Sequence, residues 1–522
     1  MGLKLSDDLF PSERKTLRLT FQKDPFTLDP QISGDEVSSA VIFLLYRGLT
    51  RLEPDQSISC DLASSYYILN DYTKYVFHLG KHTWSDGSPI TAQDIVYSWK
   101  RALEPEFPIR ASNIFHPIKN AISARQGLCS LDEVGIFAQD DETLVVELEY
   151  PCPYFLELTS FCTLFPSPAK KKNKKADLIC SGSFTLEKWI EGNEILLKRN
   201  PLCKNPSVQL DAIHIRVIPN EKEAFDLFEQ GELDWIGDPL SPLPINYLPA
   251  LLMEKKIKPL AGLVGCWFNS LTSYFYNRNL RKAVAYAISR EKLLKKLLLP
   301  NALLANRFLP SLLQEEEGVA GIEENGEWAR SLFQKGLDEL GEEKLTVTLS
   351  YENREEFAHM ASLVKAQVES ILPMTIHLDP LCYKEFWQRI PRYEFEMGLA
   401  CSISQYTDAI NFFERFEFKN TMRNFSGWES ILYQDLLKQY RQTSDLKKRR
   451  ELGARAEKIL LEEMPLAPLY YHHLAYLQKP HVKNLRVSPI GVMQFDRVIL
   501  ERQQELDFSK NDYSLFEATH SS

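Results

Sequence analysis

The stretch KYVFHLGKHTWSDGSPITAQDIVYSWKRALEP, residues 74–105, decides the fold class of this 522-residue chain. Its first seven residues have the composition of a strand, and the turn WSDG follows at 84–87. Thr91, with Asp94 three residues later, has the pattern of a capping box and opens a helix in which apolar residues recur at helical spacing. A strand followed directly by a capped helix indicates an α/β protein.

The same alternation continues outward in both directions, so the class is α/β throughout. In the first half, strands are expected at 15–22, 143–150, 194–200 and 212–219, and helices at 35–47 and at 221–230, where Gly231 ends the last one. In the second half, the pattern predicts helices at 279–299, 355–371, around Phe386, 428–442 and 445–464, and strands at 345–352, 374–381, 394–400 and 465–477. A chain of this length exceeds one hydrophobic core, so two or three globular units are expected.

Composition excludes several classes of protein. The net charge of -10 argues against a nucleic-acid surface, which needs clustered Lys and Arg. The basic run at 170–175 and the acidic stretch at 315–327 are interpreted as solvated loops. No window reaches the roughly 20 apolar residues that cross a bilayer, the best being VIFLLY at 41–46. The first 15 residues lack a signal-peptide pattern, so we expect either a cytoplasmic protein or one whose export signal has been removed.

Motifs for chemistry are also absent from the sequence. Nine cysteines stand without any Cys-x-x-Cys spacing, which predicts that most are buried thiols, with one or two disulfides left open. There is no nucleophile elbow, phosphate loop, Gly-x-Gly-x-x-Gly or His-Glu-x-x-His. His472 and His473 lie on a predicted strand, where adjacent side chains point to opposite faces, so a shared metal is not expected. No cofactor is predicted, and a hydrolase remains the alternative from another class.

Seven segments, in order along the chain, resemble the bacterial extracellular solute-binding proteins of family 5, the receptors of peptide and nickel importers. These are LDPQ at 28, YRGLTRLEPD at 46, HTWSDGSPITAQDIVYSWKRALEP at 82, YPCPYFLELTS at 150, SGSFTLEKWIEGNEILLKRNP at 181, FEQGELD at 228 and NRNLRKAVAYAISREKLL at 277. Each alone is weak, since WSDG is also an ordinary turn. Together they cover nearly the whole chain.

The resemblance implies a two-lobed periplasmic-binding-protein fold of type II, cluster C, with a ligand cleft between lobes and an extra inserted domain. The implied division is lobe I at 1–50, 176–262 and 482–522, the inserted domain II at 51–175, and lobe III at 263–481. It also implies a monomer that captures extended oligopeptides by hinge closure for an ABC permease and its ATPases, in the periplasm or cell envelope, without chemistry on the ligand. Nucleic acid is not an expected partner.

The resemblance further implies where peptide binds. Two segments would pair with the ligand backbone: 34–37, with Asp35, Glu36 and Val37, and 400–405, with Cys401, Ser402, Ile403 and Gln405. Tyr97 and Tyr383 match aromatic positions near ligand in relatives, although packing in the core explains either equally well.

One departure from the family concerns charge. Relatives that bind a free amino terminus carry Asp at the position of Gln405, and a Trp at the position of Ser402. Asp408 is either a substitute for this missing aspartate or the N-cap of the helix AINFFERF. Asp35 or Glu36 could also be the substitute. These departures favour an altered ligand, such as a blocked or cell-wall-derived peptide; nickel is the alternative within the family, and some relatives bind haem.

Overall fold

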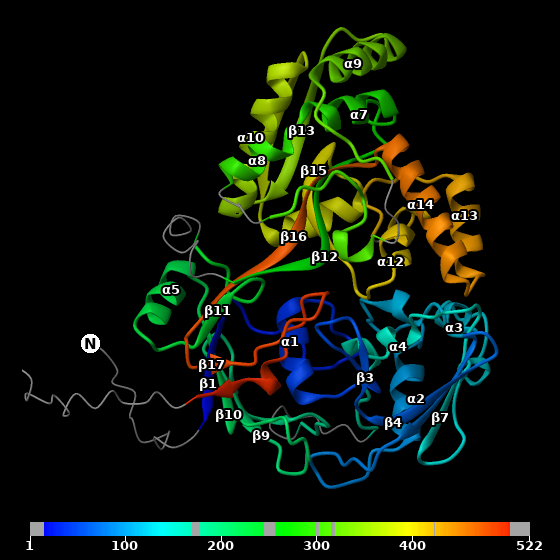
Figure 1. Ribbon diagram of the computed structural model, residues 1–522, viewed down its shortest axis with the longest axis vertical. Helices are drawn as coiled ribbons and strands as arrows, with labels where there is room; N and C mark the ends of the chain where they lie inside the picture. Colours follow the sequence, from blue (N-terminus) through cyan, green and yellow to red (C-terminus); the bar gives the residue numbers. More distant parts are fainter. Residues whose placement is uncertain are drawn as a thin grey trace, which may run out of the picture.

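The computed structural model describes residues 15–169, 178–244, 256–297, 302–314, 319–421 and 423–501. Three larger sheets and two two-stranded ones, with their helices, build a molecule in which most of the second half of the chain stands above the first (Figure 1). The basic run at 170–175, residues 315–318 of the acidic stretch and the predicted helix end at 298–299 lie outside the described residues. No helix in the described ranges is long and apolar enough to cross a membrane.

The first lobe is built on a four-stranded sheet in the order β1-β10-β9-β8. Its strands are β1 (Thr16–Phe21), β8 (Phe184–Ile190), β9 (Glu194–Arg199) and β10 (Ala212–Val217), with helices α1 (Glu36–Leu45) and α5 (Glu221–Glu229) and the short pair β17 (Val482–Lys483) and β18 (Ile499–Leu500). β1 is parallel to β10, and the other pairs are antiparallel. The alternating residues Leu17, Leu19 and Phe21 are fully buried, which confirms the strand predicted there.

The inserted domain has an antiparallel sheet in the order β4-β5-β7-β6, with α2 against β6 and β7. Its elements are β2 (Thr50–Leu52), β3 (Ile58–Cys60), β4 (Ala63–Leu69), β5 (Lys74–Leu79), α2 (Ala92–Ala102), α3 (Ala121–Arg125), β6 (Ile136–Ala138), β7 (Thr143–Glu147) and α4 (Phe155–Leu158), with 3-10 turns at 112–115, 131–133 and 162–164. The capping box before α2 is confirmed, because Asp94 accepts hydrogen bonds from the Thr91 backbone N–H at 2.9 Å and from its hydroxyl at 3.1 Å.

The second lobe is built on a six-stranded sheet in the order β11-β16-β12-β15-β13-β14. Its strands are β11 (Trp235–Gly237), β12 (Lys256–Phe268), β13 (Leu345–Glu352), β14 (Met374–Leu381), β15 (Met397–Ile403) and β16 (Leu466–Gln478). The helices are α7 (Arg278–Ala287), α8 (Arg290–Lys296), α9 (Gly326–Leu340), α10 (Glu355–Ile371), α11 (Tyr383–Arg389), α12 (Ile410–Phe413), α13 (Ile431–Arg441) and α14 (Leu446–Glu463), with 3-10 turns at 311–313, 390–392 and 414–416. The 3-10 turn at 495–497 belongs to the first lobe.

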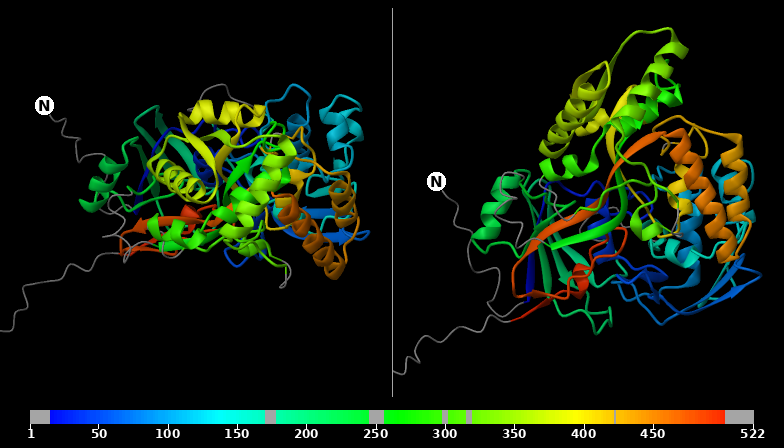
Figure 2. Two further views of the ribbon diagram at one scale, coloured as in Figure 1. Left: turned by 90° about the horizontal axis from the view of Figure 1, so that it is seen from above. Right: turned by 45° about the horizontal axis from the view of Figure 1, so that its top comes forward.

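The two long strands β12 and β16 connect the lobes, running side by side from the first lobe into the second (Figures 1 and 2). Along β12, Leu260 belongs to the core of the first lobe, whereas Ala261 belongs to the core of the second. Along β16 the change falls between Tyr471 and Leu474. The pairing of the two strands is irregular at this level, between Pro259 and Leu263. A break in the ladder where two cores meet is suited to a hinge.

One predicted helix is wrong in its extent. The stretch 279–299 forms two helices, α7 and α8, because Ile288 has an extended backbone between them. The N–H of Ser289 donates to Gln367 Oε1 of α10 at 2.6 Å instead of continuing α7. The Arg290 guanidinium donates to the carbonyls of Ala285 and Ile288 at the end of α7. Tertiary contacts therefore interrupt a helical pattern that the sequence shows as continuous.

Candidate functional site

Strand β15 has an unpaired edge on the side of the second lobe that faces the first. It pairs with β12 along its whole length, from Met397 to Ile403. Its parallel pairing with β13 reaches only from Met397 to Leu399. Residues 400–403, here called the free edge, therefore have a neighbouring strand on one side only among the described residues. Unpaired backbone groups on such an edge can hydrogen bond an extended peptide.

The free edge presents two different sets of side chains. Cys401 and Ile403 are partly exposed, whereas Ser402 and Ser404 are buried. Side chains alternate across a strand, so the two sets lie on opposite faces. The hydroxyls of Ser402 and Ser404 are buried and have no partner.

The segment 34–37 lies on the first lobe at the start of α1. Asp35 caps this helix, because its Oδ1 accepts the Ser38 N–H at 2.9 Å, while its Oδ2 is buried without a partner. A Cβ on Gly34 would lie 2.7 Å from Cβ of Arg110, so this loop packs closely against the inserted domain. The Arg110 guanidinium in turn lies 4.2 Å from the ring centre of Phe26.

Charges from both lobes converge on the Cys401 thiol. Burial raises its pKa most, and the carboxylates of Glu356 and Glu36 raise it further. The guanidinium groups of Arg354 and Arg415 act in the opposite direction. Glu36 belongs to the first lobe and the other three to the second, so segment 34–37 and the free edge lie within electrostatic range of each other.

The two predicted aromatic residues are both outside the core. Tyr383 is 52% exposed at the start of α11, and Lys23 Nζ of the first lobe lies 4.5 Å from its ring centre. Burial raises the pKa of Tyr383, and the carboxylates of Glu36 and Glu352 add to this effect. Tyr97 is 39% exposed on α2, whose buried face is formed by other residues, Ile95 and Trp99 among them. Tyr383 therefore lies between the lobes, whereas Tyr97 lies on the exposed side of α2 in the inserted domain.

Gln405 continues from the free edge into a contact with the inserted domain. Its Oε1 accepts a hydrogen bond from Asn113 Nδ2 at 2.7 Å. Two residues later, the backbone N–H and the hydroxyl of Thr407 both donate to Glu157 Oε2 at 2.6 Å. Between them the Tyr406 ring stacks on Tyr154, with centroids 4.9 Å apart and planes 5° from parallel. We call residues 405–407 the contact segment.

Asp408 uses both carboxylate oxygens within the second lobe. Oδ1 accepts the Ile410 N–H at 3.0 Å and the Tyr440 hydroxyl at 3.2 Å. Oδ2 forms an ion pair with Arg449 at 2.6 Å. Asp408 therefore bonds the first residue of α12, but the N-cap position expected for it is taken by Ala409.

The paired histidines lie at the hinge level of β16. Burial lowers the pKa of His472 to about 3, with His473 and Arg354 acting in the same direction. The two ring centres are 6.3 Å apart. Across the described ranges, no three His, Cys, Asp or Glu side chains are grouped as a metal site, and all nine cysteines are free thiols.

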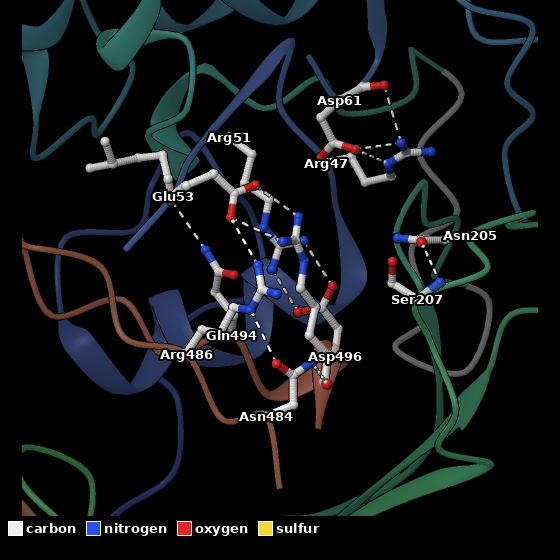
Figure 3. Close-up of polar contacts among 12 residues, drawn as sticks. Arg47, Arg51, Glu53, Asp61, Asn205, Ser207, Asn484, Arg486, Gln494 and Asp496 are labelled. Atoms are coloured by element: carbon white, nitrogen blue, oxygen red, sulfur yellow. Dashed lines mark hydrogen bonds and ion pairs between the residues drawn. The ribbon is translucent and has the colours of Figure 1, made fainter. Parts of the chain in front are cut away.

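A hollow lies where α1, β2 and the C-terminal segment 488–496 meet. Figure 3 shows its charged groups in pairs: Arg51 with Asp496, at 2.8 and 2.7 Å, Arg47 with Asp61, and Glu53 toward Arg486. The same C-terminal segment reaches the hinge, because the Ala261 N–H donates to Pro489 O at 2.8 Å. The hollow contains none of the residues predicted to bind peptide.

Sequence reasoning missed several charged residues of the interlobe site, above all Lys23, Glu157, Glu356 and Arg415. Their partners are distant in sequence; Glu157 and Thr407, for example, are 250 residues apart. The one local signal was Arg415 in the aromatic-rich run AINFFERF, where a buried charged residue is unusual.

Comparison with known proteins gives consistent results. The family model described as bacterial extracellular solute-binding proteins, family 5, middle region, matches residues 57–424. The oligopeptide-binding protein OppA of Bacillus subtilis is 32% identical over 507 residues, covering 92% of each chain. Among solved structures, Listeria monocytogenes OppA bound to peptide has a TM-score of 0.81 and 25% identity, with 94% of this chain and 100% of that chain covered.

The arrangement of the lobes can be compared through one further protein. The structure of the Escherichia coli murein tripeptide binding protein MppA is 23% identical to this chain, with a TM-score of 0.84 over 94% of this chain and 99% of that chain. Its unliganded open form, with 94% and 98% covered, gives 0.73. The two-lobed fold expected from sequence is confirmed. The lobes of this chain are arranged more like those of the first MppA structure than like those of the open form.

Proposed function

This chain belongs to the bacterial extracellular solute-binding proteins of family 5, and we propose that it is the peptide-capturing receptor of an ABC-type importer. The observation that carries the proposal is the free edge at 400–403, which lies within electrostatic range of segment 34–37 of the first lobe. An extended peptide bound there would gain strand-like hydrogen bonds that do not depend on its side chains. The relatives named as oligopeptide-binding, and the Listeria structure with its peptide, support this ligand class.

Capture would occur by closure about the hinge in β12 and β16. A peptide that contacts both lobes does so only in the closed form, so binding shifts the population toward that form. The receptor would then deliver its ligand, chemically unchanged, to a membrane permease with cytoplasmic ATPases. We place this non-enzymatic monomer in the periplasm or cell envelope. The division into lobe I, inserted domain II and lobe III, with boundaries at 50/51, 175/176, 262/263 and 481/482, is part of the same proposal.

The family's aspartate at the position of Gln405 is missing, and the neutral side chain that replaces it is already bonded to Asn113. A ligand ammonium at this place would lack its counter-charge, which costs on the order of 2–5 kcal/mol. We therefore extend the proposal to peptides without a free α-amine at this position, such as blocked or cell-wall-derived peptides.

Titration calorimetry on ligand-stripped, refolded protein tests both parts. The titrants are a mixed pool of tri- to pentapeptides and the same pool after amino-acetylation. Saturable heat and a raised melting temperature are expected with both pools, because ligand stabilises only the folded form. Heat with free peptides alone would contradict the extension, and heat with neither pool would contradict peptide binding itself.

A further inference from the structure

Arg415 lies against the end of the free edge and is buried, with 5% of its surface exposed. It belongs to the 3-10 turn that follows α12. Its Nη2 donates to the carbonyl of Ile403, the last residue of the free edge, and its Nε is buried with no partner. Its charge also acts on the Cys401 thiol. The guanidinium therefore lies against the edge at which a peptide would bind.

Arg415 forms no ion pair in the described part of the chain, although the charge of its neighbour Glu414 acts on it. Three other arginines at this end of the second lobe each pair with a carboxylate: Arg423 with Glu414, Arg441 with Glu417 and Arg449 with Asp408. Arg415 pairs with none of them. Burial, and then the neighbouring Arg423, hold its pKa well below the ordinary value. An unpaired buried cation is costly unless an anion completes the site.

Arg290 shows what a purely structural buried arginine looks like in this lobe. It is also 5% exposed and has no carboxylate partner. Its guanidinium, however, donates to four backbone carbonyls, those of Ala285, Ile288, Ala305 and Pro468. Arg415 has one such acceptor. Each arginine keeps one buried nitrogen without a partner, but Arg415 has fewer acceptors and therefore more unused hydrogen-bonding capacity than Arg290.

The charges around Arg415 indicate the sign of the charge on a ligand group that would lie against it. Gln405, which follows the free edge, contributes no charge. Glu36 and Glu356 act on Cys401, whereas Arg415 is acted on by the like charge of Arg423 and, less strongly, by the opposite charge of Glu414. Glu414 is paired with Arg423, so the Ile403 end of the free edge has an excess of positive charge, while Glu36 and Glu356 lie nearer Cys401.

We infer that a carboxylate of the bound peptide lies against Arg415, at the Ile403 end of the free edge. This inference rests on the proposed function, and names the ligand group that the site selects. The carboxylate is either the C-terminus of the peptide or an acidic side chain. Arg415 would thus determine specificity. Relatives with an aspartate at the position of Gln405 select a positively charged ligand group, whereas this chain would select a negatively charged one.

The test is calorimetry on ligand-stripped protein with three pools of mixed tetrapeptides. The first pool contains neither Asp nor Glu and has free C-termini, the second is its C-terminal amide, and the third is an amidated pool that begins with Glu. We expect the amide to bind about 30-fold more weakly than the free acid, since losing one charge of a buried pair costs at least about 2 kcal/mol. If the carboxylate is a side chain, the third pool binds most tightly instead.

Substitutions then assign the effect to Arg415. Arg415→Gln should bring the ratio of affinities for acid and amide close to one, whereas Arg415→Lys, which keeps the charge, should retain the preference for the acid. Arg290→Gln is the matched control, because it removes a buried guanidinium from the same lobe and should lower the unfolding midpoint without changing the ratio.

The outcomes separate the two proposals. If all three pools bind equally to the native protein, or Arg415→Gln keeps the native ratio, the inference fails while peptide binding stands. If no pool produces heat, the proposed function fails and the inference fails with it.

Discussion

Asp408 and Gln405 are three residues apart, yet the fold gives them unrelated tasks. Both oxygens of Asp408 are used inside the second lobe, by Ile410 and Tyr440 on one side and Arg449 on the other. Moving that carboxylate to a ligand ammonium would leave Arg449 buried and unpaired, at a cost of about 3–5 kcal/mol. Of the substitutes considered from sequence, Asp35 has a buried oxygen without a partner. A free α-amine would therefore have to approach segment 34–37 instead of the Gln405 end.

Glu157 makes the contact between the inserted domain and the second lobe sensitive to pH. Burial raises the pKa of its carboxyl to about 7, the Thr407 hydrogen bonds oppose this, and the Asp408 charge adds to it. Because the pKa is higher in the folded state, the stabilisation is complete below the ordinary value near 4.5 and is lost as pH rises through about 7.

Glu157→Gln should remove this dependence while keeping an oxygen that accepts from Thr407. We expect equal unfolding midpoints for variant and native protein at pH 5, and a higher midpoint for the variant at pH 8, from a gain on the order of 2 kcal/mol. Differential scanning calorimetry at both values measures this. Glu106→Gln, at an exposed position, is the control. A gain of the same size at both pH values would show that ionisation of Glu157 is not the cause.

At the scale of elements, the local sequence pattern was sufficient to predict a helix or strand whose bounds depend on its own buried face. The expected helix at 355–371 and the expected strand at 374–381 coincide with α10 and β14, because apolar residues recur there at helical and strand spacing. The prediction failed where a contact with a residue distant in sequence determines where an element ends. The break between α7 and α8 depends on Gln367 of α10, and β15 extends to Ile403 because β12 pairs with it that far.

The candidate site divides in the same way. The two backbone segments could be named from the family resemblance, because backbone positions follow the fold. The charges around them could not, since Glu157 finds Thr407, and Glu36 approaches Cys401, only after distant parts of the chain have folded together. Whether the named residues bind peptide stays a prediction.

Gly262 is the position in β12 at which the hinge, β15 and β16 meet. A Cβ there would lie 3.0 Å from His472 Cβ and 3.2 Å from Ile403 Cγ1, which is tighter than ordinary packing. Gly262→Ala should therefore cost about 1–3 kcal/mol through overpacking and should displace the free edge. We expect peptide affinity to fall about tenfold in calorimetry.

Gly326→Ala is the matched control for this prediction. A Cβ at Gly326 would approach Ile371 no closer than 3.7 Å, so the substitution should be tolerated. If the two variants bind peptide with equal affinity, the close approach at Gly262 does not restrict the hinge.

At the scale of the whole molecule, the distribution of the cores determines what can move. The inserted domain and the second lobe share one continuous buried cluster, which the Tyr154–Tyr406 stack and the contact segment help to join. Most of the first lobe has a core of its own. The strands β12 and β16 cross from one core to the other at Leu260 and at 472–473. Opening should therefore be a rotation of the first lobe against the rest, although Trp84 and Phe165 of the inserted domain, which pack in the first core, limit its direction.

Small-angle X-ray scattering can detect this rotation in solution. The radius of gyration of ligand-stripped protein should fall when the tri- to pentapeptide pool is added, because a ligand held by segment 34–37 and the free edge favours the closed arrangement. Free alanine at the same concentration, which cannot span the two lobes, should leave the radius unchanged. A radius that stays constant while calorimetry reports saturable peptide binding would mean that the lobes are already closed without ligand. The contact segment, and not the peptide, would then set the arrangement of the lobes.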